Sequence, residues 1–147
     1  MTIYFEDLAV GDEWTYGEYD VTEDELVDFA EQYDPQWFHT DRERAAAESP
    51  YGGLIASGWH TAAMTMRLLV EGFLDDTATM GAKGVDELRW RKPVEPGDTL
   101  RIKITVEDTT VDSDSRGTVR LRIDTTNAAD ELVCSMVGIV MVARRNE

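Results

Sequence analysis

Three stretches in the last third of the chain alternate apolar and polar residues, and short polar turns separate them. Residues 99–107 read TLRIKITVE, residues 118–126 read TVRLRIDTT, and residues 132–142 read LVCSMVGIVMV. Alternation with a period of two is typical of β-strands that bury one face. The turns at 112–117 and 127–130 join the stretches directly, which predicts an antiparallel meander. The third stretch is the least polar and is therefore predicted to be a central strand.

One long apolar helix is predicted ahead of these strands. Residues 58–74 place apolar side chains at helical spacing on a face so broad that most sides of the helix must be buried. Nearer the N-terminus, residues 13–20 alternate as a strand. Thr22 and Glu25 then have the spacing of a capping box. The helix that they begin is expected to end near Tyr33, because a residue before proline resists the α conformation.

Shorter elements complete the predicted order. Thr40 can cap a short helix over residues 41–47, residues 81–84 indicate a loop or bulge, and residues 85–92 are expected to form another strand. Strand, helices and then antiparallel strands are the pattern of an α+β protein. We expect a single domain over residues 1–147, with a curved antiparallel sheet wrapped around the long helix.

Composition excludes several classes of protein. The chain has 147 residues, which is enough for one hydrophobic core. No apolar run reaches the roughly 20 residues of a membrane span, and the N-terminus lacks the pattern of a signal peptide. The single cysteine, Cys134, lies in an apolar strand and has no partner for an internal disulfide. A cytoplasmic location is therefore expected, with no membrane partner.

The charge is strongly negative. Thirty acidic residues oppose fourteen basic ones, giving a formal charge of -16, and the acids are spread along the whole chain. Such a composition, with few lysines, resembles that of proteins from salt-loving organisms, in which salt screens self-repulsion. No basic stripe is present to neutralise phosphates, so nucleic acid is not an expected partner.

Asp34 and His39 are the first candidates for chemistry. They lie five residues apart across the break at Pro35, where a loop can bring a carboxylate and an imidazole to one water molecule. Such a pair can transfer protons near neutral pH. Aspartate before proline is also a common turn residue, and a histidine can cap a loop, so the spacing alone leaves a structural role open.

The step from Ser57 to Gly58 supplies a second candidate. Ser57 can cap the long helix, and the unpaired N–H of Gly58 would lie at the positive end of the helix dipole. A carbonyl oxygen bound there would be stabilised as it gains negative charge. The alternative is an ordinary helix cap that binds water. His60 is expected to be a satisfied polar residue at the helix end.

Other site chemistries lack their motifs. The chain has no H-x-x-x-H or C-x-x-C pair, no glycine-rich phosphate loop and no G-x-S-x-G. We therefore predict no metal site, no nucleotide hydrolysis and no serine hydrolase activity.

Two motifs give the chain a family resemblance. Residues 34–39 read DPQWFH and are followed by the glycine-rich step 52–58, GGLIASG; residues 88–98 read LRWRKPVEPGD. In this order and spacing the chain resembles the MaoC-like dehydratases, the (R)-specific enoyl-CoA hydratases of the hot-dog fold. The resemblance implies a homodimer, a trans-2-enoyl-CoA substrate, an (R)-3-hydroxyacyl-CoA product, and no cofactor beyond the coenzyme A of the substrate.

The resemblance also implies roles for individual residues. Asp34 and His39 would activate water and protonate the α-carbon, and the Gly58 N–H would bind the thioester oxygen. Substrate contacts are expected from the loop and from the basic strand end, at Gln36, Trp37, Phe38, Ser57, Trp59, Arg89, Arg91 and Lys92. Because CoA is a polyanion and the chain is acidic, a phosphate-binding cluster is expected among Lys83, Arg89, Arg91 and Lys92; the alternative is that they are exposed strand residues with no ligand.

The chain departs from the family pattern at two positions. Gln36 replaces the usual asparagine, and Met66 stands beside Thr65 where hydratases often place a serine on the central helix. Two other activities of the same fold remain open at this point. One is an acyl-CoA thioesterase, and the other is a non-catalytic subunit that binds acyl-CoA.

Overall fold

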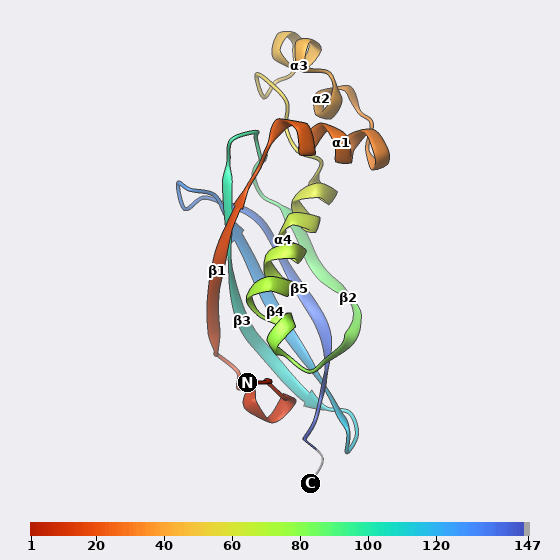
Figure 1. Cartoon of the computed structure of the whole chain (residues 1–147), viewed down its shortest axis with the longest axis vertical. Helices are drawn as coiled ribbons and strands as arrows, with labels where there is room; N and C mark the ends of the chain where they lie inside the picture. The colour runs from red at the N-terminus through yellow and green to blue at the C-terminus, as the bar shows by residue number, and fades with distance from the viewer. Residues whose placement is uncertain (146–147) are drawn as a thin grey trace.

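The structure is a computed structural model that describes residues 1–145. Its centre is one five-stranded sheet in the order β1-β3-β4-β5-β2, with every neighbouring pair antiparallel (Figure 1). The strands are β1 (Glu13–Asp20), β2 (Thr79–Trp90), β3 (Thr99–Val111), β4 (Arg116–Thr126) and β5 (Leu132–Ala143). The predicted meander is therefore confirmed.

Within residues 1–145, four α-helices accompany the sheet. They are α1 (Glu23–Tyr33), α2 (Trp37–Thr40), α3 (Arg42–Glu48) and α4 (Gly58–Gly72), with short 3-10 turns at Phe5–Asp7 and Leu74–Asp76. Helix α4 runs along one face of the sheet, and the three other helices gather beyond its first residue (Figure 1). This arrangement confirms the predicted α+β hot-dog fold. No helix within residues 1–145 is both long and apolar enough to cross a membrane.

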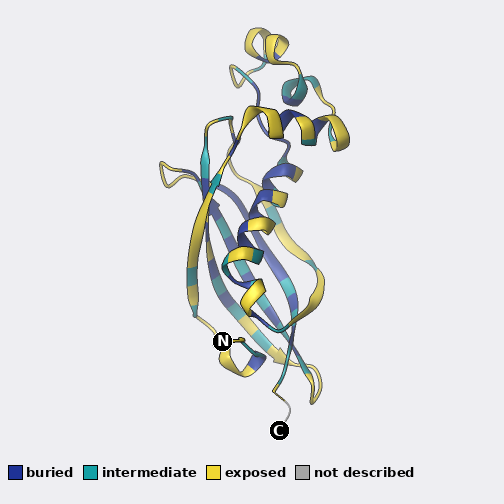
Figure 2. Cartoon of the chain, viewed as in Figure 1, coloured by how far each residue is buried: buried dark blue, intermediate teal, exposed yellow. Residues whose placement is uncertain are grey.

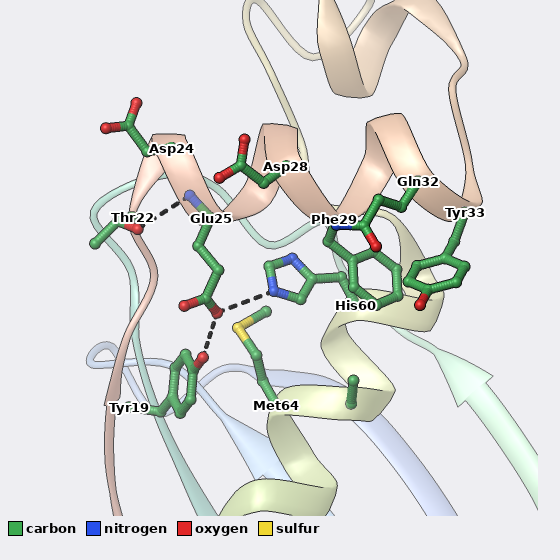
Figure 3. Close-up of a pocket in the computed structure, with 11 residues that line it drawn as sticks. Tyr19, Thr22, Asp24, Glu25, Asp28, Phe29, Gln32, Tyr33, His60 and Met64 are labelled. Carbon is green, nitrogen blue, oxygen red and sulfur yellow. Dashed lines mark hydrogen bonds and ion pairs between the residues drawn. The ribbon is translucent and has the colours of Figure 1, made fainter.

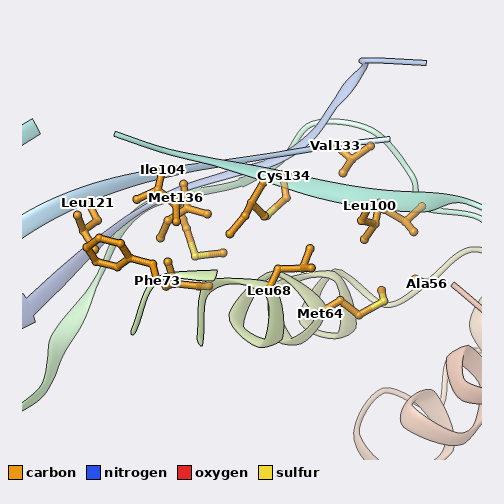
Figure 4. Packing of buried hydrophobic residues seen from close by; sticks show 14 of the residues in the cluster. Ala56, Met64, Leu68, Phe73, Leu100, Ile104, Leu121, Val133, Cys134 and Met136 are labelled. Atoms are coloured by element: carbon orange, nitrogen blue, oxygen red, sulfur yellow. The ribbon is translucent and has the colours of Figure 1, made fainter. Parts of the chain in front are cut away.

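The core fills the space between α4 and the sheet. Leu68 of α4 is fully buried, and Leu100 and Ile104 of β3 are fully buried opposite it. Figure 4 shows Leu68 on the helix facing side chains of β3 and β5 on the sheet. The buried positions of β3 and β4 alternate with partly exposed ones, as a period of two requires, and Figure 2 shows the buried band under the helix.

Two details differ from the sequence prediction, and one agrees with it. Strand β2 begins at Thr79, six residues before the predicted start, and contains the segment 81–84 as an irregular stretch with register shifts against β5. Strand β5 lies inside the sheet between β4 and β2, as predicted for the least polar strand. Helix α3 is capped by Asp41, whose side chain accepts a hydrogen bond from Arg44 N at 3.0 Å, rather than by Thr40.

The predicted capping box of α1 is half formed. The Thr22 side chain accepts a hydrogen bond from Glu25 N at 3.3 Å, as predicted. The Glu25 carboxylate is instead bonded to His60 and to the hydroxyl of Tyr19. The Glu25 side chain therefore connects α1 to β1 and α4 and does not bond the backbone of Thr22.

Candidate active site

Asp34 is held where α1 ends. It is the C-cap of that helix, and its backbone N–H donates to the carbonyl of Ala30 at 2.8 Å. Pro35 prevents continuation of the helix, so the next residues turn back and Gln36 N donates to the Asp34 carbonyl at 2.8 Å. The turn leaves the Asp34 side chain 18% exposed and directed toward the first residues of α4.

The Asp34 carboxylate has three partners. Ser57 Oγ donates to Oδ2 at 2.7 Å, Gln36 Nε2 donates to Oδ1 at 2.7 Å, and His39 Nε2 lies 3.2 Å from Oδ2. Burial raises the pKa of Asp34, but the bonds from Ser57 and Gln36 and the nearby imidazole together outweigh it. The pKa of Asp34 therefore lies below its ordinary value, and the group is a carboxylate at neutral pH.

His39 is oriented by the segment before α4. Its side chain is 6% exposed, and Nδ1 lies 2.7 Å from the carbonyl oxygen of Ile55. Because a carbonyl only accepts, Nδ1 carries a proton and donates a hydrogen bond to the Ile55 carbonyl, which directs Nε2 toward Asp34 Oδ2. The backbone N–H of Ile55 donates in turn to the Phe38 carbonyl at 3.2 Å, so the loop and the histidine fix each other.

His39 faces a cleft of about 270 Å³ at the start of α4. The two sequence motifs meet there, because the cleft is also lined by the segment after β2. The backbone N–H of Ala56 donates to the Val94 carbonyl at 2.8 Å and joins the two segments. The lining residues are His39, Tyr51, Ile55, Ala56, Gly58, Thr61, Trp90, Arg91, Lys92, Pro93 and Val94.

Gly58 is the first residue of α4, and it forms part of the cleft wall. Within residues 1–145 its N–H donates no hydrogen bond, as expected for the first turn of a helix. The Trp90 indole lies against Gly58 so closely that a Cβ on residue 58 would come within 2.4 Å of the ring. Only glycine allows this contact, and Trp90 thereby covers one side of the helix terminus.

Gly58, the predicted oxyanion donor, thus lies in the same cleft as His39. The Ser57 side chain does not cap α4 as predicted. Ser57 is the N-cap residue of α4, but its side chain makes no capping bond to the helix. The helix is begun by the Ser57 carbonyl, which accepts from His60 N at 2.9 Å and Thr61 N at 3.1 Å. The hydroxyl is directed to Asp34 instead.

The aromatic residues predicted to contact substrate lie in two places: Trp37 and Phe38 are in α2, and Trp59 is at the start of α4. Phe38 meets the His39 ring edge-on, with centroids 4.5 Å apart. Trp37 lies under the guanidinium of Arg44, 4.3 Å from its ring centroid, and does not line the cleft. Trp59 is 58% exposed and contacts Trp90 edge-on.

The basic residues predicted to bind phosphate also lie in different places. Arg91 and Lys92 line the cleft, whereas Arg89 does not and bonds the Leu88 carbonyl. Lys83 donates to Thr118 near the other end of β2, at 2.8 Å. The four bases therefore do not form one cluster.

Three features of the cleft were missed by the sequence analysis. Thr61 is 3% exposed and brings a hydroxyl group to the cleft from the first turns of α4. Its spacing of three from Gly58, which places both on one helix face, was the available signal. Tyr51 and Trp90 complete the wall.

Met66 is half exposed and lies outside the cleft, and Thr65 bonds Thr125 at 2.7 Å.

No group of three or more histidine, cysteine, aspartate or glutamate side chains lies close enough to hold a metal ion in the described part of the chain. The site as it stands consists of a carboxylate, an imidazole, a helix terminus and two cations. These groups can polarise water, transfer a proton and stabilise an oxyanion.

Known proteins share both the sequence and the fold. The family model "MaoC like domain" matches residues 9–128. A solved MaoC-like dehydratase from Rhodospirillum rubrum is 42% identical, with a TM-score of 0.90 and 99% of each chain covered. The Bacillus subtilis protein YdeM is 32% identical over 125 residues, or 84% of this chain and 87% of that protein. The 3-hydroxyacyl-thioester dehydratase Z of Mycobacterium tuberculosis is 33% identical over 108 residues, 72% of this chain and 70% of that protein. The chain belongs to the MaoC-like dehydratase family.

Proposed function

We propose that this protein is an (R)-specific enoyl-CoA hydratase, which adds water reversibly to trans-2-enoyl-CoA and gives (R)-3-hydroxyacyl-CoA. The observation that carries the proposal is the pairing of Asp34 Oδ2 with His39 Nε2 at 3.2 Å, beside a cleft that ends at the N-terminus of α4. The similarity to a 3-hydroxyacyl-thioester dehydratase supports the class of reaction.

The reaction needs two proton transfers and one stabilised oxyanion. The pair formed by Asp34 and His39 holds water, whose oxygen bonds to the β-carbon as the π bond breaks. One water proton passes to the pair, and the pair returns a proton to the α-carbon. The elements of one water molecule are thus added to the double bond with no change of redox state, and coenzyme A enters only as part of the substrate.

Gly58 is assigned to the thioester. As the β-carbon is attacked, negative charge moves to the thioester oxygen, and a free N–H at a helix terminus is suited to stabilise it. Trp90 shields this end of the helix from one side, which lowers the local dielectric constant and strengthens the interaction. Thr61 lies on the cleft wall about one turn later on α4, and its hydroxyl is proposed to assist.

The assembly proposed here is a homodimer formed across β2. That strand is an edge of the sheet, and large apolar side chains are exposed along it and on the neighbouring face of α4: Trp59, Met66, Met80, Val85 and Trp90. An apolar hollow of about 340 Å³ lies between the two elements. A second copy would cover both the edge and this surface. Sedimentation equilibrium tests the proposal, and a monomer at micromolar concentration would contradict it.

The activity is tested by hydration of crotonyl-CoA in molar KCl, followed as loss of the enoyl absorbance. Chiral analysis of the product tests the (R) assignment. The Asp34→Asn/His39→Gln double variant is expected to lose at least about 10²-fold in kcat, the lower range for general acid–base catalysis, while still binding a CoA ligand. Unchanged hydration by the double variant would exclude this pair as the catalytic residues.

Two other outcomes would point to other functions of the fold. Release of free thiol from acyl-CoA would indicate a thioesterase. A folded dimer that binds acyl-CoA but neither hydrates nor hydrolyses it would indicate a non-catalytic binding subunit.

A further inference from the structure

His60 is the second histidine of the chain, and the mechanism above does not use it. It lies in the first turn of α4 and is 3% exposed. Its ring stacks on Phe29 of α1, with centroids 4.7 Å apart and an interplanar angle of 11°. Its Nε2 lies 3.1 Å from Oε1 of Glu25, also in α1 (Figure 3).

The protonation of these groups follows from their partners. A carboxylate accepts, so Nε2 of His60 carries a proton and donates to Glu25. Burial lowers the pKa of His60, and the bond to Glu25 only partly opposes it, so the ring is neutral near pH 7. Burial and the bond to Glu25 raise the pKa of Tyr19 to about 12, which keeps the Tyr19 hydroxyl a donor to the same oxygen.

The other ring nitrogen is unpaired. Nδ1 of His60 is buried and has no hydrogen-bond partner within residues 1–145. A buried polar atom without a partner costs stability, because its desolvation is not compensated. An apolar residue would fill this place without that cost. The histidine is therefore better explained by what its other nitrogen holds than by its contribution to packing.

Within residues 1–145, side-chain hydrogen bonds join α1 to the start of α4 at two points, and the bond from His60 to Glu25 is one of them. Glu25 lies in the first turn of α1 and is bonded to His60, while Asp34 is its C-cap and is bonded to Ser57. The two anchor points are nine residues apart, about 14 Å along a helix. Ser57 and His60 flank Gly58, so both anchors end beside the proposed oxyanion donor.

We infer that His60 is a positioning residue, which holds α1 through Glu25 and Phe29 so that the Asp34 carboxylate keeps its working distance from the Gly58 N–H. The inference rests on the proposed function. When the His60 anchor is removed, the buried residues Leu26 and Ala30 still pack α1 into the core, but α1 loses a polar contact with α4 and can shift relative to it. A displacement of about 1 Å at a catalytic group can reduce turnover about 10²-fold.

The test compares substitutions of Glu25 that remove, keep or move the oxygen that accepts from His60 and Tyr19. Glu25→Ala removes it and is expected to lower kcat about 10- to 100-fold. Glu25→Gln keeps a carbonyl oxygen for both donors and is expected to stay within about 3-fold of wild type. Glu25→Asp keeps the charge but withdraws the acceptor by one methylene, and a loss of more than about 3-fold is expected. KM should change little throughout, because CoA is bound elsewhere.

Asp28→Ala is the matched control. Asp28 is an exposed carboxylate one turn further along α1, lines the same depression as His60, and forms no side-chain hydrogen bond within the described residues. Its removal should leave kcat unchanged. Equal kcat in wild type, Glu25→Ala and Glu25→Asp would overturn the inference. A loss in Glu25→Gln as large as in Glu25→Ala, or a similar loss in Asp28→Ala, would do the same.

A second measurement is independent of catalysis. The chain has two histidines, so ¹⁵N-histidine labelling gives one pair of ring-nitrogen signals for each imidazole, and His39→Gln assigns the pairs. Glu25→Ala should shift the His39 signals as well as those of His60, since Asp34 moves against His39; Glu25→Gln should leave His39 in place. If wild type hydrates nothing, the proposed function fails, and this spectrum still decides the positioning role. Unmoved His39 signals in Glu25→Ala and Glu25→Asp would overturn it.

Discussion

The hydroxyl of Ser57 donates a hydrogen bond to Asp34 Oδ2 at 2.7 Å, although Ser57 occupies the N-cap position of α4. Serine at that position ordinarily binds the helix backbone. Here the side chain connects the start of the central helix to the carboxylate at the end of α1. One bond therefore aligns the two proposed catalytic elements and lowers the pKa of Asp34.

Removing this bond is expected to move the pH profile. Asp34 is proposed to work as a carboxylate, so activity is lost as pH falls through its pKa. Ser57→Ala deletes a bond that favours the charged form, so the pKa of Asp34 rises and the acid limb of kcat/KM shifts to higher pH. Gln36→Ala should shift it in the same direction, because Gln36 bonds Oδ1. An acid limb that is identical in all three proteins would contradict this role.

The same pKa predicts a stability effect. A carboxylate whose pKa is lower in the folded state contributes stability that is present above the unfolded value, near 3.9, and is lost as pH falls through the folded value. Urea denaturation of wild type and Asp34→Asn across acid pH measures this contribution. The difference in unfolding free energy between them should shrink as pH falls; a constant difference would show that Asp34 is not linked to folding.

The sequence predicted most of the fold because its signals are local. The alternation in β3 and β4 marks their buried faces directly. The first half of β2 was missed because residues 79–84 do not alternate, and the segment pairs with β5 only through register shifts. The full pairing order depends on contacts between strands, and the low polarity of β5 indicated only that this strand lies inside the sheet.

The site was predicted in part, for a similar reason. Asp34 and His39 lie in one short motif, and His39 Nε2 lies 3.2 Å from Asp34 Oδ2 in the folded chain. Trp90 lies against Gly58 from a position 32 residues away, so only the folded chain shows the contact. The diversion of Ser57 and Glu25 from capping is also a tertiary effect, since each side chain found a partner on another element.

The contact between Trp90 and Gly58 makes a prediction about stability. Gly58→Ala places a methyl group within 2.4 Å of the ring, an overlap that must displace Trp90. Such overpacking costs about 1–3 kcal/mol. In the Trp90→Ala background the methyl group meets no ring, and the same substitution should be close to neutral. Urea denaturation of wild type, Gly58→Ala, Trp90→Ala and the double variant gives the coupling free energy between the two positions. If Gly58→Ala costs the same unfolding free energy in both backgrounds, the proposed contact is excluded.

Arg91 and Lys92 are the two bases that line the cleft, and we propose that they bind the phosphates of the proposed CoA substrate. The pairing of Lys92 with Glu131 is half exposed and therefore weak enough to yield to a phosphate. We expect Arg91→Glu/Lys92→Glu to raise KM about tenfold, or ~1.4 kcal/mol, with kcat little changed. Lys83→Glu is the control, since Lys83 lies about 25 Å away along the strand. A rise in KM of equal size in the control would show a general effect of charge.

Salt should stabilise the folded protein. A formal charge of -16 on a chain of 147 residues creates self-repulsion that is relieved as the Debye length falls from about 10 Å at 0.1 M to about 3 Å at 1 M. Salt also weakens ion pairs such as Arg122–Glu107, at 2.7 Å, but partly exposed pairs contribute only about 0–1 kcal/mol each. Because the acids outnumber the bases about two to one, we expect repulsion to dominate and Tm to rise with KCl.

Charge-neutral variants test whether this effect of salt is electrostatic. Asp28→Asn/Glu31→Gln removes two exposed charges from α1 without changing side-chain size. The double variant should have a higher Tm than wild type in 0.1 M KCl, and the difference should nearly vanish in 1 M KCl, where the repulsion is already screened. If the difference in Tm between the double variant and wild type persists in 1 M KCl, the substitutions act through helix propensity or local packing. A wild-type Tm that stays flat or falls between the two concentrations would show that the surface ion pairs outweigh the net charge.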